Sequence, residues 1–121
     1  MQPRGTKKTS NKIRINFSYI KEPNIRDNYI ASKIKQRRRQ IIVHSIIYYR
    51  FNSNIVSDIK FDSWCNELIQ LQYKYPKISQ RVELYEDFKD FSHASGFNLK
   101  SLNNPCFINI AEGLLNGIQI Y

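Results

Sequence analysis

A long stretch without Gly or Pro, from Tyr29 to Tyr75, predicts helical structure through the middle of the chain. We expect Pro23 to break the chain before it, and a first helix to begin at Tyr29 with Asn28 or the residue before it as the cap. The first half of this helix is charged and its second half is apolar almost all round. The helix is therefore expected to run from solvent into the core.

Residues three or four apart lie on one face of a helix, so this helix presents two rows of side chains on different faces. We expect the two rows to have different roles. One row, Ile42, Ile46 and Tyr49, is predicted to be core. The other row mixes charged, aromatic and apolar side chains, and we expect it to face a ligand. Its members are Arg37, Ile41, His44 and Tyr48.

A turn over residues 52–54 separates this helix from a second one, which begins at Ser57 or Asp58 and is ended by Pro76. The apolar residues of the second helix recur with the period of an amphipathic helix. They are Phe61, Trp64, Cys65, Leu68, Leu71 and Tyr75. Asp58 and Asp62 lie in its first turns, where the helix dipole favours negative charge, so a structural role alone explains them.

Weaker patterns extend the mostly α fold beyond this helical hairpin. We predict a third helix over residues 79–91 and a loop over residues 92–104. A last helix is predicted to start at Pro105 and run through Leu115, followed by a short extended end.

The N-terminal part has a different character. Strict alternation of polar and apolar residues over positions 12–19 predicts one short β-strand. That strand would pack on the helical body, or pair with a second chain or with an edge of a target. We expect residues 1–24 to form a basic, partly disordered arm, and residues 25–121 to form one small helical domain.

The basic charge of the chain is concentrated at its N-terminus. Residues 1–40 contain 12 Lys and Arg against 2 acidic residues, whereas residues 41–121 contain 7 against 8, within a net charge of +9. Such segregated charge suits nucleic acid or an acidic protein that imitates it, because neutralising phosphates releases counterions without a defined pocket. The alternative is a tail that only increases solubility. The predicted phosphate-facing residues are Lys7, Lys8, Lys12 and Arg14 in the arm, and Lys33, Lys35, Arg37, Arg38 and Arg39 in the first helix.

Several classes of protein are excluded by the sequence. No apolar run is long enough to span a bilayer, and the first 20 residues lack a signal-peptide pattern, so we expect a cytoplasmic protein. Cys65 and Cys106 lie too far apart in sequence for a metal-binding knuckle, and we expect both to be buried, reduced thiols. No metal site is predicted.

The run of residues 48–62 carries the most specific motif in the chain. A tyrosine pair, Tyr48 and Tyr49, is followed by a short turn, by Asp58, and by Phe61 and Asp62 near the start of a helix. The continuation of that helix keeps the spacing at Glu67, Leu68, Leu71, Tyr75 and Pro76. This motif resembles the N-terminal nicotinamide-binding domain of NAD-dependent DNA ligases and, more loosely, small ligase-related proteins of bacteriophages.

The resemblance implies a nucleotide site with NAD or nicotinamide mononucleotide as its ligand. Tyr48 would stack on the cationic nicotinamide ring, while Asp58 and Asp62 would accept hydrogen bonds from the ribose hydroxyls or the carboxamide. Two positions differ from the family, because Phe61 replaces a pocket tyrosine and Tyr49 replaces a histidine. The alternative is that these aromatic residues are only the core of a helical hairpin.

Ligation itself is not expected. The sequence contains no Lys-x-Asp-Gly motif to accept an adenylate and no Gly-rich phosphate loop, and its two histidines lie far apart. We predict a non-catalytic, phage-type accessory protein that needs no cofactor and binds nucleic acid or a nucleoprotein complex. One version of that role is inhibition of a host defence system such as CRISPR. The alternatives are a protein that binds or sequesters NAD or nicotinamide mononucleotide, and a structural protein that dimerises.

Overall fold

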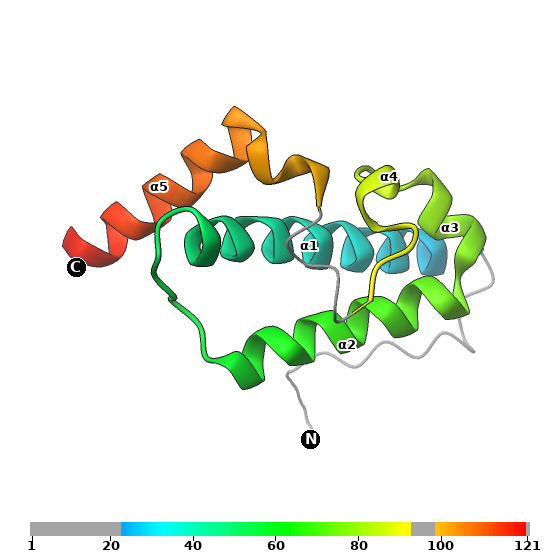
Figure 1. The fold of residues 1–121 in the computed structure, drawn as a ribbon. Coiled ribbons are helices and arrows are strands. Elements are labelled where there is room, and N and C mark those ends of the chain that lie inside the picture. The colour runs from blue at the N-terminus through cyan, green and yellow to red at the C-terminus, as the bar shows by residue number, and fades with distance from the viewer. Residues whose placement is uncertain (1–22, 93–98, 121) are drawn as a thin grey trace, which may run out of the picture.

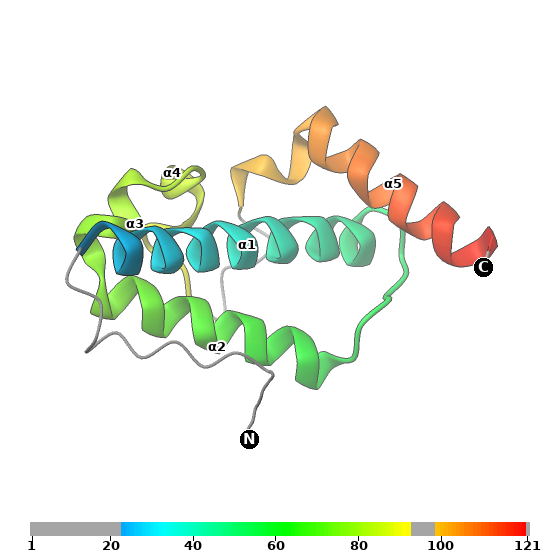
Figure 2. The ribbon, with the colours of Figure 1, turned by 180° about the vertical axis from the view of Figure 1, so that it is seen from behind.

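Two antiparallel helices form the frame of the protein (Figure 1). The computed structural model describes residues 23–92 and 99–120. The frame consists of α1, Pro23–Tyr49, and α2, Asp58–Lys74. The remaining elements are α3 (Pro76–Arg81), α4 (Tyr85–Phe88), the short 3-10 helix η4 (Lys100–Asn103) and α5 (Pro105–Ile120). Figure 2 shows from behind that α4 and α5 lie on the opposite side of α1 from α2.

The prediction of a mostly helical fold with a helical hairpin is confirmed for the part of the chain that the structure describes. The predicted strand at residues 12–19 lies outside the described residues. The same holds for the four basic residues of the arm, Lys7, Lys8, Lys12 and Arg14. These predictions stay open.

The start of α1 differs from the prediction. The helix begins at Pro23 and already includes Asn28, which we had expected to cap a helix from Tyr29. Proline is tolerated in the first turn of a helix because its missing N–H would have no partner there, and its fixed φ already suits the helix. Pro23 therefore opens the helix instead of breaking the chain before it, and the expected domain boundary at residue 24 falls inside α1.

The start and end of α2 agree with the boundaries predicted from the sequence. Ser57 caps the helix, and its side-chain oxygen accepts a hydrogen bond from the backbone N–H of Lys60 at 3.1 Å. The helix ends at Lys74, after which the N–H of Tyr75 still donates to the carbonyl of Leu71. Pro76 then opens α3, so it both ends one helix and starts the next.

Side chains between the two helices fix their register. Arg37 of α1 pairs with Glu67, Arg38 hydrogen-bonds Gln72, and the His44 ring packs at 5.1 Å from Trp64. Residue numbers thus rise along α1 as they fall along α2. Continuing this register past His44 places the C-terminal end of α1 opposite the first turn of α2.

The core is built mainly from α1. An i, i+4 row along this helix is buried, and the helix contacts α2, α3, η4 and α5. The members of that row are Ile30, Ile34, Arg38, Ile42 and Ile46. Two predictions for α1 are wrong, because Ile41 is buried and does not face a ligand, and Tyr49 is 54% exposed and is not core.

The predicted helix over residues 79–91 is wrong, because the chain turns sharply inside it. α3 ends at Arg81, Val82 is extended, and Leu84 has a left-handed φ of 70° before α4 begins. The carbonyls of Val82 and Glu83 accept hydrogen bonds from the Arg38 guanidinium at 3.0 and 2.9 Å. Those two carbonyls are directed at a side chain of α1, which interrupts the helix without a Gly or Pro.

The last helix starts at Pro105 as predicted but continues to Ile120, so the expected extended end is helical instead. Its inner face packs on α1 through Phe107 and Ala111. Cys106, in the first turn, is exposed, whereas Cys65 is buried, so the prediction of burial holds for one thiol only. Desolvation raises the pKa of Cys65 to about 11. None of the described helices is long and apolar enough to cross a membrane.

Candidate functional site

The site predicted from the motif lies where α1 ends and α2 begins. Tyr48 and Tyr49 are both exposed at the last turn of α1, and their rings meet edge to face at 4.9 Å with an angle of 82°. An edge-to-face pair is a favourable aromatic geometry, so the two rings stabilise each other's orientation. Large exposed aromatic side chains next to a turn are typical of binding surfaces, and these two are not the core of the hairpin.

The connection between the two helices adds polar groups next to the tyrosines. The N–H groups of Arg50 and Ser53 donate back to the carbonyls of Ile46 and Ile47, which folds the chain over the end of α1. Asn52 has a left-handed φ of 55°, a conformation that Asn adopts more readily than most residues. The turn predicted at residues 52–54 is thereby confirmed.

A hollow of about 290 Å³ opens at this junction. Its lining combines the tyrosine pair with small polar side chains of the connection. The lining residues are Tyr48, Tyr49, Asn52, Ser53 and Asn54. It is an open hollow, whose size suits one ring and a sugar more than a whole dinucleotide.

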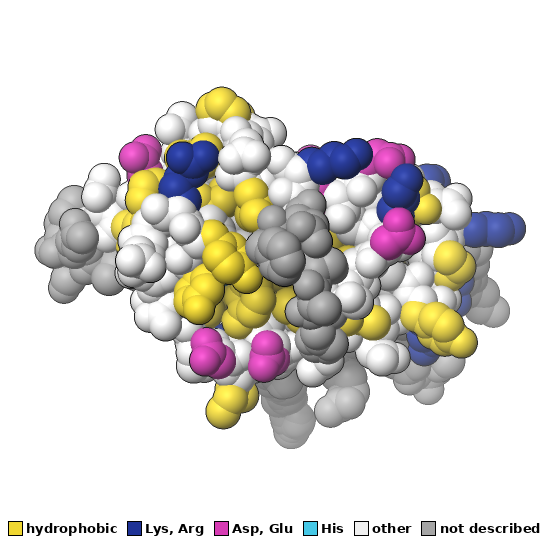
Figure 3. Space-filling view, viewed as in Figure 1, with side chains coloured by type: hydrophobic (Ala, Val, Ile, Leu, Met, Phe, Trp, Pro, Cys, Tyr) yellow, Lys and Arg dark blue, Asp and Glu magenta, His cyan; other side chains and the backbone are white. Residues whose placement is uncertain are grey.

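Two carboxylates stand on the opposite side of this junction. Asp58 and Asp62 lie one turn apart at the start of α2, and both are exposed. Neither forms an ion pair with another described residue. Figure 3 shows the hydrophobic side chains of this face gathered in a patch, with acidic side chains along its lower edge. The negative charge is therefore available to a ligand.

Phe61 has a different role from its neighbours in the motif. Its ring is partly buried and packs against the hydrophobic core. A phenyl ring has no hydrogen-bonding group, so Phe61 supports the start of α2 and offers a ligand only apolar contact. The prediction that it lines a nucleotide site stays open.

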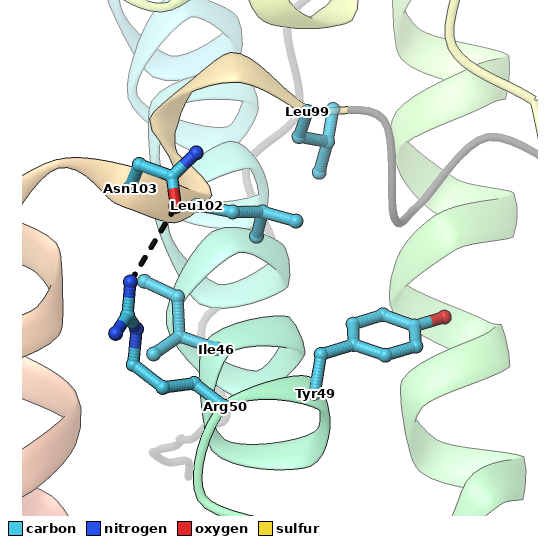
Figure 4. Close-up of a pocket in the computed structure, with 6 residues that line it drawn as sticks. All are labelled: Ile46, Tyr49, Arg50, Leu99, Leu102 and Asn103. Carbon is cyan, nitrogen blue, oxygen red and sulfur yellow. Dashed lines mark hydrogen bonds between the residues drawn. The ribbon is translucent and has the colours of Figure 1, made fainter.

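A second hollow lies on the other side of Tyr49 (Figure 4). Its volume is about 390 Å³, and it has an apolar floor with an arginine and an amide at one rim. Its lining residues are Ile46, Tyr49, Arg50, Leu99, Leu102 and Asn103. Of these residues, only Ile46 and Tyr49 were predicted to belong to the core or to a site. Leu99, Leu102 and Asn103 come from η4 and the residue before it, a segment whose packing on α1 no pattern in the sequence revealed.

The predicted row of cations on α1 is mostly occupied by intramolecular partners. Arg37 pairs with Glu67 and Arg39 with Glu83. Arg38 is fully buried and its guanidinium is hydrogen-bonded on all sides, so the prediction that it faces phosphate is wrong. Lys35 is exposed and Lys33 is partly exposed, and neither forms an ion pair with an acidic side chain among the described residues.

His44 lies one helical turn before Tyr48 in α1, and its ring packs against the Trp64 ring. Its Nδ1 atom is buried and has no hydrogen-bond partner among the described residues. Desolvation lowers the pKa of His44 below the usual value of 6.5, because the charged imidazolium would have to replace its hydration with apolar contacts. His44 therefore does not face a ligand as predicted, but supports the packing of α1 on α2.

This burial makes stability pH-dependent. Below pH 6.5 the unfolded chain takes up a proton at His44 more readily than the folded chain, so stability is complete above that pH and falls as the pH is lowered. We expect the urea midpoint of the wild type to drop between pH 7.5 and pH 5.5, and His44→Leu to reduce that drop. His93→Gln, which removes the other histidine of the chain, is the matched control. A drop of the same size in His44→Leu would contradict the assignment.

Comparisons with known proteins point to the same part of the chain. The family described as DNA ligase-like, N-terminal NAD+-binding domain matches residues 23–81, which cover α1, α2 and α3. A DNA ligase of Thermoanaerobacter sp. (strain X514) is 36% identical in an alignment of 69 positions that covers 50% of this chain and 10% of the ligase. A DNA ligase of Pseudothermotoga lettingae is 33% identical in an alignment of 73 positions that covers 54% of this chain and 11% of the ligase. No solved structure matches.

The resemblance seen in the motif of residues 48–62 is thus confirmed. The chain spans about a tenth of the length of the curated relatives it matches. The matched segment includes the tyrosine pair, both aspartates and the first hollow. It does not include η4 and α5.

Proposed function

Because residues 23–81 match the N-terminal NAD+-binding domain of DNA ligases, we propose that this chain binds the nicotinamide mononucleotide half of NAD+ at the junction of α1 and α2. The observation that carries the proposal is one hollow lined by two exposed tyrosines at the end of α1, with the exposed carboxylates of Asp58 and Asp62 in the first turns of α2 across the junction. A pyridinium ring is a cation, so it is attracted both to aromatic faces and to carboxylates.

Each group has a separate part in this proposal. The exposed Tyr48 ring offers a face for the nicotinamide, and its edge contact with Tyr49 keeps it in place. Asp58 and Asp62 accept hydrogen bonds from the ribose hydroxyls, a geometry that suits carboxylates because each has two acceptor oxygens. The missing hydroxyl at Phe61 reduces the polar contacts, so recognition rests more on charge and stacking.

The chain takes part in binding and not in adenylate transfer under this proposal. Its 121 residues contain no Lys-x-Asp-Gly sequence, and the described residues contain no group of His, Cys, Asp and Glu that could hold a metal ion. Under this proposal the ligand is held and released unchanged. Sequestration of the nucleotide, or its presentation to another protein, is consistent with this behaviour.

Calorimetric titration with nicotinamide mononucleotide tests the proposal. We expect the wild type to bind, and Asp58→Asn with Asp62→Asn to weaken binding by about tenfold to a hundredfold, because hydrogen bonds to charged groups contribute about 1.5–3 kcal/mol. Asp90→Asn, which removes an exposed carboxylate near α4 at the other end of the hairpin, is the control. Absence of binding to the wild type, or an unchanged affinity of the double variant, would refute the proposal.

A second candidate function is binding of nucleic acid or of a nucleoprotein complex, including one that belongs to a host defence system. The observation that favours it is the charge of residues 1–40, with 12 basic residues against 2 acidic ones. The ion pairs of Arg37 and Arg39 and the burial of Arg38 count against α1 as the main contact. The phosphate contacts in this candidate therefore come from Lys33, Lys35 and the arm.

A further inference from the structure

The second hollow has a positive pole that no acid neutralises within the described part of the chain. Arg50 follows the last turn of α1, its side chain is exposed, and it takes part in none of the ion pairs. Its one hydrogen bond runs from Nη2 to the Oδ1 atom of Asn103 at 3.4 Å. This is long for an N–H···O contact, so the guanidinium keeps most of its donors for another acceptor.

The floor beneath this arginine is apolar. Ile46 and Leu99 are buried, and Leu102 packs against the core beside them. In Figure 4 the Arg50 side chain reaches toward η4, while the Tyr49 ring points toward α2, so the two border opposite sides of the hollow.

Tyr49 connects the two hollows because its ring lines both of them. The Tyr49 ring points toward α2, whose first turns carry Asp58 and Asp62, whereas Arg50 lies on the side of η4. Tyr49 therefore stands between the helix that carries the negative charge and the positively charged Arg50. A ligand with a cationic ring at one end and an anionic group at the other would match this order of charges, whereas a purely cationic ligand would meet Arg50 with the wrong sign.

We propose that Arg50 and Asn103 form a subsite for the phosphate attached to the ribose of a nicotinamide nucleotide, a deduction that rests on the proposed function. The Arg50 guanidinium donates two N–H groups to the phosphate oxygens, and the Asn103 amide is turned so that its NH₂ group donates as well. The nicotinamide ring occupies the first hollow, and the chain of ribose and phosphate passes Tyr49 into the second.

This subsite would give the chain selectivity for phosphorylated ligands. Nicotinamide riboside offers the same ring and ribose but no phosphate, so it would contact only the first hollow. Both nicotinamide mononucleotide and NAD+ carry the phosphate, as a monoester in one and as part of a diphosphate in the other. η4, which supplies Asn103, lies outside the segment that matches the ligase domain, so the subsite is assembled partly by the rest of this chain.

Calorimetric titrations with riboside, mononucleotide and NAD+ test the subsite on the full chain. We expect Arg50→Gln to weaken binding of the mononucleotide by about tenfold, since one charge-assisted contact contributes about 1.5 kcal/mol or more, and to leave riboside binding unchanged. Arg50→Lys should restore part of the loss, because it keeps the charge but not the fork of donors. Arg81→Gln, an exposed arginine at the far end of the hairpin, is the matched control for charge.

The outcomes separate the two proposals. If the wild type binds none of the three ligands, the proposed function fails. If it binds riboside and mononucleotide equally well, or if Arg50→Gln weakens both to the same extent, the nucleotide site stands and the phosphate subsite is wrong. A loss for the mononucleotide alone supports a subsite for a phosphate monoester, and an equal loss for NAD+ supports one that also accepts a diphosphate. Thermal unfolding of each variant shows whether its fold is intact.

Discussion

Arg38→Ala is expected to lower the free energy of unfolding by about 3–5 kcal/mol, enough to unfold much of a small domain. The Arg38 side chain is fully buried. It hydrogen-bonds the Gln72 side chain at 2.8 and 3.0 Å, the Ser79 hydroxyl at 2.6 Å, and the carbonyls of Val82 and Glu83. Removal of the guanidinium leaves these buried groups unpaired and creates a void beside them.

The cost of burying this cation shows in its pKa. Desolvation lowers the pKa of Arg38 to about 10, and it stays charged at neutral pH because carbonyl and hydroxyl oxygens surround it. Its guanidinium also lies 6.0 Å from the ring centres of Tyr85 and Phe88. The residue thus attaches α3 and α4 to α1 through hydrogen bonds and ring contacts together.

Urea denaturation followed by circular dichroism measures the effect. Arg39→Ala is the matched control, because Arg39 is the next residue and its ion pair with Glu83 is 40% and 43% exposed, so its loss should cost no more than about 1 kcal/mol. Equal midpoints for the two variants would contradict the role assigned to Arg38. Arg38→Lys should also be strongly destabilised, since one ammonium group cannot reach all five acceptor oxygens, which include the Ser79 carbonyl.

Phe88→Ala is expected to destabilise the protein by about 3–5 kcal/mol, the range for a buried phenylalanine. Phe88 is fully buried although α4 is only four residues long. Its ring meets Phe91 edge to face at 5.0 Å, and its carbonyl accepts a hydrogen bond from the Gln72 side chain at 2.9 Å. So short a helix has little stability of its own, and this ring holds it on the core.

The same denaturation experiment measures this prediction. Tyr73→Ala removes an aromatic side chain of similar size that is 86% exposed on α2, and it should change stability by no more than about 0.5 kcal/mol. A loss in Phe88→Ala of about the size of that control would show that the α4 region adds little to the stability of the core. A loss in the expected range would place α4 inside the cooperative unit.

The hairpin could be predicted from the sequence because its signals are local. Ser57 at the cap, Pro76 after the end and the apolar period between them fix α2 without help from the rest of the chain. The tyrosine pair and both aspartates could be located for the same reason, since a motif read along the chain keeps its spacing in the folded helix pair. Their exposure follows from their place at the helix ends.

The wrong predictions for Arg38 and for the helix over residues 79–91 have the same physical cause, which is contacts between residues far apart in the sequence. A run of three arginines suggests a charged surface, yet successive residues on a helix point about 100° apart, so at least one of the three had to turn inward. The isoleucines four residues before and after Arg38, Ile34 and Ile42, both belong to the core row. That spacing was the available signal. The left-handed Leu84 gave no such signal, because its conformation depends on carbonyls that bind Arg38.

Arg38 also bears on where this protein can be divided. The segment related to the ligases ends at Arg81, whereas two carbonyl acceptors of the buried guanidinium belong to the next two residues, Val82 and Glu83. A fragment cut at the edge of the family resemblance would therefore lack two acceptors of the buried Arg38 guanidinium. The segment shared with the ligases and the folding unit therefore have different borders, and a transplant of the helical hairpin to another protein would have to carry Val82 and Glu83 with it.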